Sequence, residues 1–93
     1  MIHTNLIIHG KVHGVFFRQT ALEKAQQLNI KGTARNIPNG TVFIEAQSES
    51  TTNMQEFINW CRKGPRHAEV TDVEIFNIPE TENAKIFTEF TIE

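Results

Sequence analysis

The sequence predicts an α+β fold in which two helices cover one face of a mostly antiparallel sheet. Two stretches carry apolar residues at helical spacing, and the segments around them show the alternating pattern of strands. The chain has 93 residues, which is enough for one core of two packed layers but not for two cores. We therefore expect a single domain over residues 1–93.

The first strand is predicted over residues 4–9, where apolar residues alternate until Gly10 ends the pattern. From Phe17 the period becomes helical, and the predicted helix continues to about Ile30. Gly32 is expected to supply the stop signal after it. The apolar face of this helix consists of Phe17, Ala21, Ala25 and Leu28.

A β-hairpin is predicted next, with strands over residues 33–37 and 41–47. Residues 38–40 read Pro-Asn-Gly, a turn in which proline fixes φ while asparagine and glycine tolerate positive φ. A serine or threonine at 50–51 can cap the second helix, which Gly-Pro at 64–65 ends. The apolar stripe of that helix is Met54, Phe57, Ile58 and Cys61.

Two further strands are predicted over residues 70–78 and 85–93. The apolar spacing of the first of them slips by one near residues 71–72, which indicates a β-bulge. The resulting order is βαββαβ with an additional C-terminal strand. This order is that of the ferredoxin-like split βαβ arrangement, in which the first and third strands are central neighbours.

Charge and cysteine content exclude several classes of function. A net charge of −2 leaves no electrostatic footprint for nucleic acid or for an anionic membrane surface. The single cysteine, Cys61, permits no intrachain disulfide and reads as a buried structural thiol. The four histidines lack metal-binding helical spacing, so we expect no metal site and no cofactor. With no signal peptide or bilayer-spanning stretch, a cytoplasmic location is expected.

The segment Gly10–Arg18, "GKVHGVFFR", places two glycines, a Phe-Phe pair and an arginine where a strand becomes a helix. Helix N-termini leave backbone N–H groups without partners and carry partial positive charge. Glycines let such amides form a concave nest for an oxyanion, and Arg18 can donate two parallel hydrogen bonds to the same anion. The segment lacks the P-loop pattern, so a single phosphoryl group is the expected ligand.

The same residues have a simpler interpretation. Glycines in a strand-to-helix loop are commonly turn residues, and an arginine in a first helical turn is commonly a solvated charge. The two phenylalanines, Phe16 and Phe17, read mostly as core, although either could also form a wall of a phosphate pocket.

"GKVHGVFFR" resembles the acylphosphatase signature G-x-V-Q-G-V-x-F-R, and "GTARNIPNGTVFIEAQ" resembles the second signature of that family, G-x-V-x-N-x-x-D-G-x-V. The resemblance covers essentially the whole chain. It implies hydrolysis of acyl phosphates to a carboxylate and inorganic phosphate, with no metal and no covalent intermediate. It also implies that Asn36 positions the attacking water and that Arg18 binds the phosphoryl group. The implied phosphate-binding loop supplies the amides of His13, Gly14, Val15, Phe16 and Phe17.

Three positions depart from the family pattern: His13 replaces glutamine, Ala34 replaces valine and Asn39 replaces aspartate. His13 should contribute its backbone amide, so its side chain should be tolerated. The resemblance implies a monomer whose partners are a small acyl phosphate and inorganic phosphate, the latter as product and competitive ligand, with no nucleic acid and no membrane. The alternative is a non-catalytic ferredoxin-like module that binds RNA or regulates a larger protein.

Overall fold

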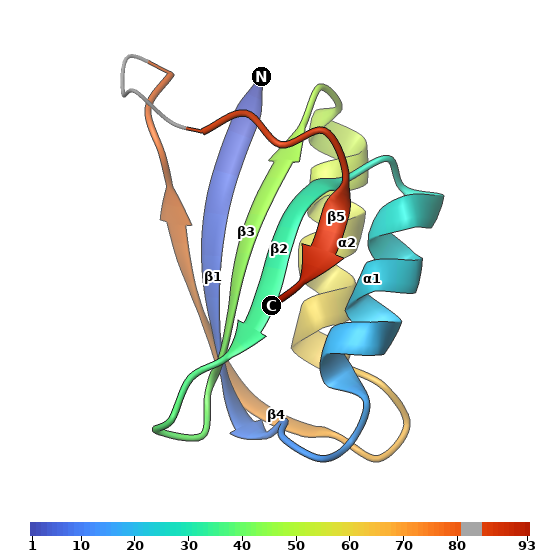
Figure 1. Ribbon diagram of the computed structural model, residues 1–93, viewed down its shortest axis with the longest axis vertical. Helices are drawn as coiled ribbons and strands as arrows, with labels where there is room; N and C mark the ends of the chain where they lie inside the picture. The colour runs from blue at the N-terminus through green and yellow to red at the C-terminus, as the bar shows by residue number, and fades with distance from the viewer. Residues whose placement is uncertain (81–84) are drawn as a thin grey trace.

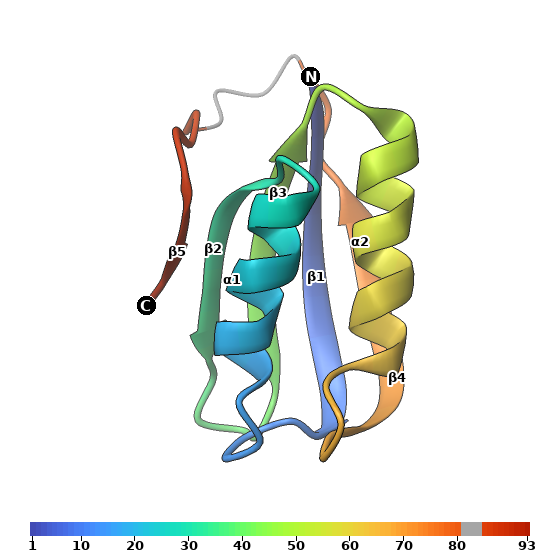
Figure 2. The same cartoon turned by 90° about the vertical axis from the view of Figure 1, so that its right-hand side faces the viewer.

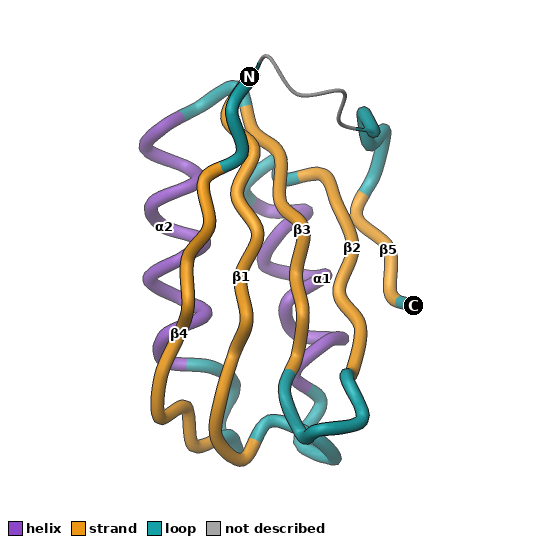
Figure 3. Tube along the Cα trace, turned by 90° about the vertical axis from the view of Figure 1, so that its left-hand side faces the viewer, coloured by secondary structure: helices purple, strands orange, loops and turns teal. Residues whose placement is uncertain are grey.

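The computed structural model describes residues 1–80 and 85–93. Two helices pack on the same face of a five-stranded sheet (Figure 1), and in Figure 2 they lie in front of it. Within the described residues, no helix covers the opposite face of the sheet (Figure 3). The elements are β1 (Ile2–Lys11), α1 (Phe17–Gln27), β2 (Lys31–Asn36), β3 (Val42–Ser48), α2 (Thr51–Lys63), β4 (Glu69–Asn77) and β5 (Phe90–Ile92).

The strand order is β4-β1-β3-β2-β5, and every neighbouring pair is antiparallel except β2 and β5, which are parallel. The predicted ferredoxin-like arrangement is therefore confirmed, including the position of β1 and β3 as central neighbours. The additional C-terminal strand extends the sheet beyond β2. This topology brings the β1–α1 loop, the β2–β3 turn and the α2–β4 connection to one end of the molecule (Figure 1).

The core lies between the sheet and the helices. Leu6 and Ile8 of β1 are fully buried there, since alternate residues of a strand point to one face. Aromatic rings join the helices to each other and to β5: Phe57 of α2 lies 5.9 Å from Phe90, centroid to centroid, and Phe17 of α1 lies 5.4 Å from Trp60. The start of α1 is thereby fixed against α2.

The end of α1 differs from the prediction. The helix stops at Gln27, and Asn29 adopts the left-handed conformation, with φ of 55°. The N–H of Ile30 then donates to the carbonyl oxygen of Ala25 at 2.8 Å, which completes a Schellman motif. Asparagine tolerates this conformation, so Gly32 is not needed as a stop.

Gly32 instead lies within β2, where it serves close packing. A Cβ at this position would lie 1.8 Å from the carbonyl oxygen of Glu45 on β3. The predicted bulge is confirmed, because His9 pairs with Asp72 whereas Gly10 pairs with Val70, and Thr71 is left over. Gly10 at this bulge and Gly32 in β2 both permit close approach of a neighbouring strand.

The last strand is shorter than predicted, since β5 covers only Phe90–Ile92 of the expected residues 85–93. The buried side chain of Gln47 forms hydrogen bonds with the backbone of the segment before β5. It donates to the carbonyl oxygen of Lys85 at 2.5 Å and accepts from the N–H of Phe87 at 2.9 Å. These backbone groups pair with a side chain, so they do not extend the strand ladder.

Candidate active site

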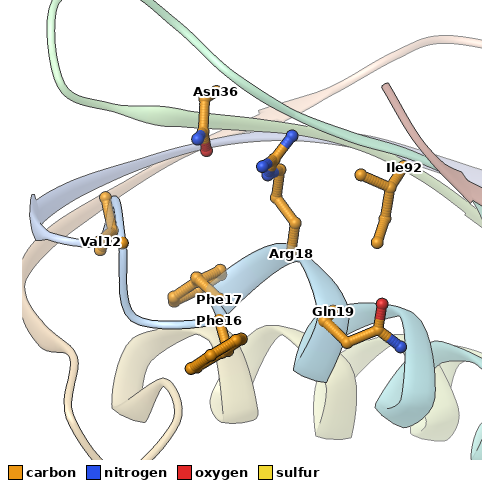
Figure 4. A pocket seen from close by; sticks show the side chains of 8 residues that line it. Val12, Phe16, Phe17, Arg18, Gln19, Asn36 and Ile92 are labelled. Atoms are coloured by element: carbon orange, nitrogen blue, oxygen red, sulfur yellow. The ribbon is translucent and has the colours of Figure 1, made fainter.

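A pocket of about 370 Å³ lies at the end of the molecule where the β1–α1 loop meets the end of β2. Arg18 enters it from the first turn of α1, as predicted, and Asn36 from the last position of β2. Figure 4 shows both side chains directed into the same space. The residues lining the pocket are Val12, Gly14, Phe16, Phe17, Arg18, Gln19, Asn36 and Ile92.

The Arg18 side chain is held by the far end of the chain. Its Nη1 donates to the main-chain carbonyl oxygen of Glu93 at 2.9 Å. The N–H of Glu93 in turn donates to the carbonyl oxygen of Ala34 at 2.9 Å, which fixes Glu93 against β2. One hydrogen bond thus orients the guanidinium, and its remaining N–H groups can serve a ligand.

The N-terminus of α1 lacks the usual cap. Phe16 occupies the N-cap position with φ of 61° and ψ of 27°, and no side chain of the described residues accepts a hydrogen bond there. The first turn of α1 contains no acidic residue to offset the helix dipole. The first amides of a helix have no intrahelical partner, so those of α1 are available to an anion.

Gly14 is the glycine of the loop that meets open space. It has φ of 70°, and a Cβ added to it would find no described atom within 4 Å. Gly10, at the start of the segment, is instead packed against β4, where a Cβ would lie 2.0 Å from the carbonyl oxygen of Glu69. The two glycines of the signature therefore have different tasks: Gly10 permits close strand packing, and Gly14 adopts a positive φ that favours glycine.

The five predicted loop residues divide into two groups. Gly14, Phe16 and Phe17 line the pocket, whereas the side chain of Val15 is buried in the core and that of His13 points to the neighbouring turn. The Nε2–H of His13 donates to the carbonyl oxygen of Thr41 at 2.8 Å. That oxygen also accepts from the N–H of Ile37 at 2.8 Å. His13 thus ties the loop to the β2–β3 turn.

The core assignment of the Phe-Phe pair is correct for Phe17 but wrong for Phe16. Phe17 is 1% exposed, whereas Phe16 is 78% exposed. The left-handed backbone at Phe16 turns its side chain away from the core, and no local pattern announces this conformation.

Sequence reasoning also missed Val12, Gln19 and Ile92 as lining residues. Gln19 follows Arg18 directly and could have been found from that position. Ile92 could not, since it reaches the pocket only because β5 pairs with β2.

The other candidate groups play no part in this pocket. Cys61 is fully buried in α2, as predicted, and burial raises the pKa of its thiol. No cluster of three or more His, Cys, Asp or Glu side chains suited to a metal ion occurs in residues 1–80 and 85–93. None of the helices in these two ranges has the length and apolarity needed to cross a bilayer.

Known proteins resemble this chain over most of its length. The acylphosphatase family model matches residues 4–92. An acylphosphatase of Rubrobacter xylanophilus is 38% identical over 80 residues, covering 86% of this chain and 72% of the relative. One of Marinobacter nauticus is 36% identical over 86 residues, covering 92% of this chain and 89% of the relative. The crystal structure of acylphosphatase from Bacillus subtilis superposes with a TM-score of 0.90 at 26% identity, covering 100% of this chain and 99% of that one.

The fold and these matches define the class as a small α+β hydrolase. The chain belongs to the acylphosphatase family.

Proposed function

We propose that this protein hydrolyses the carboxyl–phosphate bond of acyl phosphates, releasing a carboxylate and inorganic phosphate. One observation supports the chemistry above all: Arg18, the uncapped start of α1 and Asn36 line the same pocket. Membership of the acylphosphatase family supports the substrate class.

The phosphoryl group would be bound by Arg18 together with backbone amides of His13, Gly14, Val15, Phe16 and Phe17. Phosphoryl transfer passes through a loose transition state whose negative charge is spread over three equatorial oxygens. A guanidinium that is already oriented by Glu93, and amides at a fixed helix start, require little reorganisation to meet that charge. The positive end of the α1 dipole would add to the same field.

Asn36 would orient the attacking water, since a carboxamide both donates and accepts hydrogen bonds. The water oxygen forms the new bond to phosphorus while the bond from phosphorus to the acyl oxygen breaks. The acyl oxygen leaves with the bonding electron pair as a carboxylate, and the proton of the water goes to the phosphate product or to solvent. Carboxylic acids are about as acidic as Asp and Glu side chains, so the leaving group needs no general acid. The proposed mechanism therefore uses neither a metal nor a cofactor.

The test is hydrolysis of benzoyl phosphate in the presence of EDTA. We expect the parent protein to be active, Arg18→Ala to fall to background, and Asn36→Ala to fall nearly as far, with both variants still folded by circular dichroism. Arg35→Ala is the matched control, because Arg35 lies 5.0 Å from the centroid of the Phe43 ring and does not line the pocket. Undiminished activity in Arg18→Ala would contradict the assignment.

The comparisons do not favour the alternative of a binding module. Leu6 is buried under the helices, so its neighbours Asn5 and Ile7 face the other way. Each of them has one acidic and one aromatic cross-strand partner: Glu45 and Phe76 for Asn5, and Glu74 and Phe43 for Ile7. Tight RNA binding by a parent protein without hydrolase activity would favour the module.

A further inference from the structure

Phe16 combines two unfavourable features. The residue is 78% exposed, and its backbone is left-handed, which is uncommon for a bulky side chain. Among the non-glycine residues of the described chain, Asn29 is the other with positive φ, and asparagine tolerates that conformation. Strained residues of this kind concentrate at ligand-binding sites.

The conformation of Phe16 is fixed by the helix that follows. Its carbonyl oxygen accepts from the N–H of Thr20 at 3.0 Å and from the hydroxyl of Thr20 at 2.8 Å. Because two hydrogen bonds hold the peptide group, the direction in which the side chain leaves the backbone is set by the start of α1. The fixed backbone therefore places the exposed side chain at the pocket that it lines.

The in-line geometry of the proposed reaction assigns a side of the pocket to the acyl group. Attacking and leaving oxygens lie on opposite sides of phosphorus. In Figure 4, Asn36 and the Phe16 ring lie at opposite edges of the lining side chains, with Arg18 directed toward Asn36. A water held by Asn36 would thus expel the acyl oxygen away from Asn36, toward the side of the pocket formed by the loop that carries Phe16.

Apart from Arg18, Gln19 and Asn36, the side chains that line the pocket are apolar. Phe16 and Ile92 are both solvent-accessible, and Arg18, which would hold the phosphoryl group, is the single charged side chain among the described lining residues. The lining offers no second cation to pair with a negatively charged acyl group. It does offer an aromatic surface on which an apolar or aromatic acyl group can pack.

We propose that the Phe16 side chain is the specificity-determining contact for the acyl group, and that it favours acyl phosphates with an aromatic or large apolar acyl part. The inference rests on the proposed function and adds a second role to Phe16. Its amide belongs to the phosphate-binding loop, whereas its ring recognises the other half of the substrate.

The experiment compares kcat/KM for benzoyl phosphate and acetyl phosphate in the parent and in three variants at one position. Phe16→Leu removes the ring while retaining an apolar side chain and the backbone strain. Phe16→Gly removes both the ring and the strain, and Phe16→Tyr retains the ring. The matched control is Phe76→Leu, since Phe76 is also an exposed phenylalanine, 46% accessible, but lies on β4 away from the pocket.

We expect Phe16→Leu and Phe16→Gly to lower the benzoyl-to-acetyl ratio of kcat/KM by about tenfold, mainly through a higher KM for benzoyl phosphate. Phe16→Tyr and Phe76→Leu should keep the parent ratio. An unchanged ratio in Phe16→Leu and Phe16→Gly, with an active parent, would overturn this inference alone. A parent that hydrolyses neither substrate would overturn the proposed function together with it.

Discussion

The two helices begin in opposite ways. At α2, Ser50 is in an extended conformation, and its hydroxyl oxygen accepts from the N–H of Asn53 at 3.1 Å. At α1, Phe16 is left-handed, and no side chain of the described residues caps the first turn. The second residue of α1 is moreover a cation, Arg18, next to the positive end of the helix dipole.

These differences have a free-energy cost. An N-cap of the kind at α2 stabilises a protein by about 1 kcal/mol. The strained backbone at Phe16 costs about 1–3 kcal/mol, and a cation near a helix N-terminus costs a further ~0.3–1 kcal/mol. A bound phosphoryl group would offset these terms by accepting from the free amides and from Arg18. The start of α2 therefore stabilises the fold, whereas the start of α1 is suited to an anion.

Among the predictions that contrast the two helix starts, the largest effect is expected from a negative charge placed at the start of α1. Gln19→Glu should lower kcat/KM for benzoyl phosphate about 100-fold. A carboxylate ~5 Å from the bound phosphoryl group would repel it by about 3 kcal/mol at an effective dielectric constant of 20. Inhibition by inorganic phosphate should weaken in parallel. Gln55→Glu in α2 is the control, since Gln55 is exposed, forms a hydrogen bond with Asn59 and does not line the pocket. Equal activity of the two variants would contradict an anion site at α1.

Inorganic phosphate should stabilise the fold through the same helix end. At 100 times its dissociation constant, a ligand that binds only the folded state raises the free energy of unfolding by about 2.7 kcal/mol. Urea unfolding with and without phosphate measures this. The increase should vanish in Arg18→Ala and persist in Ser50→Ala. Full protection in Arg18→Ala would place the bound phosphate elsewhere.

A change at the capped start of α2 should lower stability and leave activity unchanged. Ser50→Ala should lower the free energy of unfolding by about 1 kcal/mol, because the N–H of Asn53 loses its acceptor. Its kcat and KM should match those of the parent, as Ser50 does not line the pocket that contains Arg18 and Asn36. Thermal unfolding followed by circular dichroism, together with the benzoyl phosphate assay, checks both expectations. A loss of activity without a loss of stability would remove the contrast between the two helices.

The smallest effect is expected at His13, which supports the uncapped helix from outside by joining the loop to Thr41. A neutral hydrogen bond contributes about 1 kcal/mol, so His13→Ala should lower kcat less than tenfold. His13→Gln should restore it, because a glutamine amide can donate to the same carbonyl oxygen. Failure of glutamine to restore kcat, when alanine has lowered it, would assign the effect to the imidazole itself.

Much of the fold was predictable because its signals are local. The cap at Ser50, the bulge at Thr71 and the place of Arg18 in a first helical turn all depend on a few neighbouring residues. The prediction erred where two local signals competed. Asn29 and Gly32 both favour the end of a helix, and the approach of β3, where the Glu45 carbonyl faces Gly32, decided between them.

The sequence by itself determined the order of the elements, the helix starts and the two family signatures, because hydrophobic period and turn chemistry act over one or two turns of chain. Only the tertiary structure decided that Glu93 orients Arg18, that Ile92 reaches the pocket and that Phe16 is exposed beside it. The first two contacts join the start of α1 to residues more than seventy positions away. They exist because β5 pairs with β2, and nothing near Arg18 in the chain encodes that pairing.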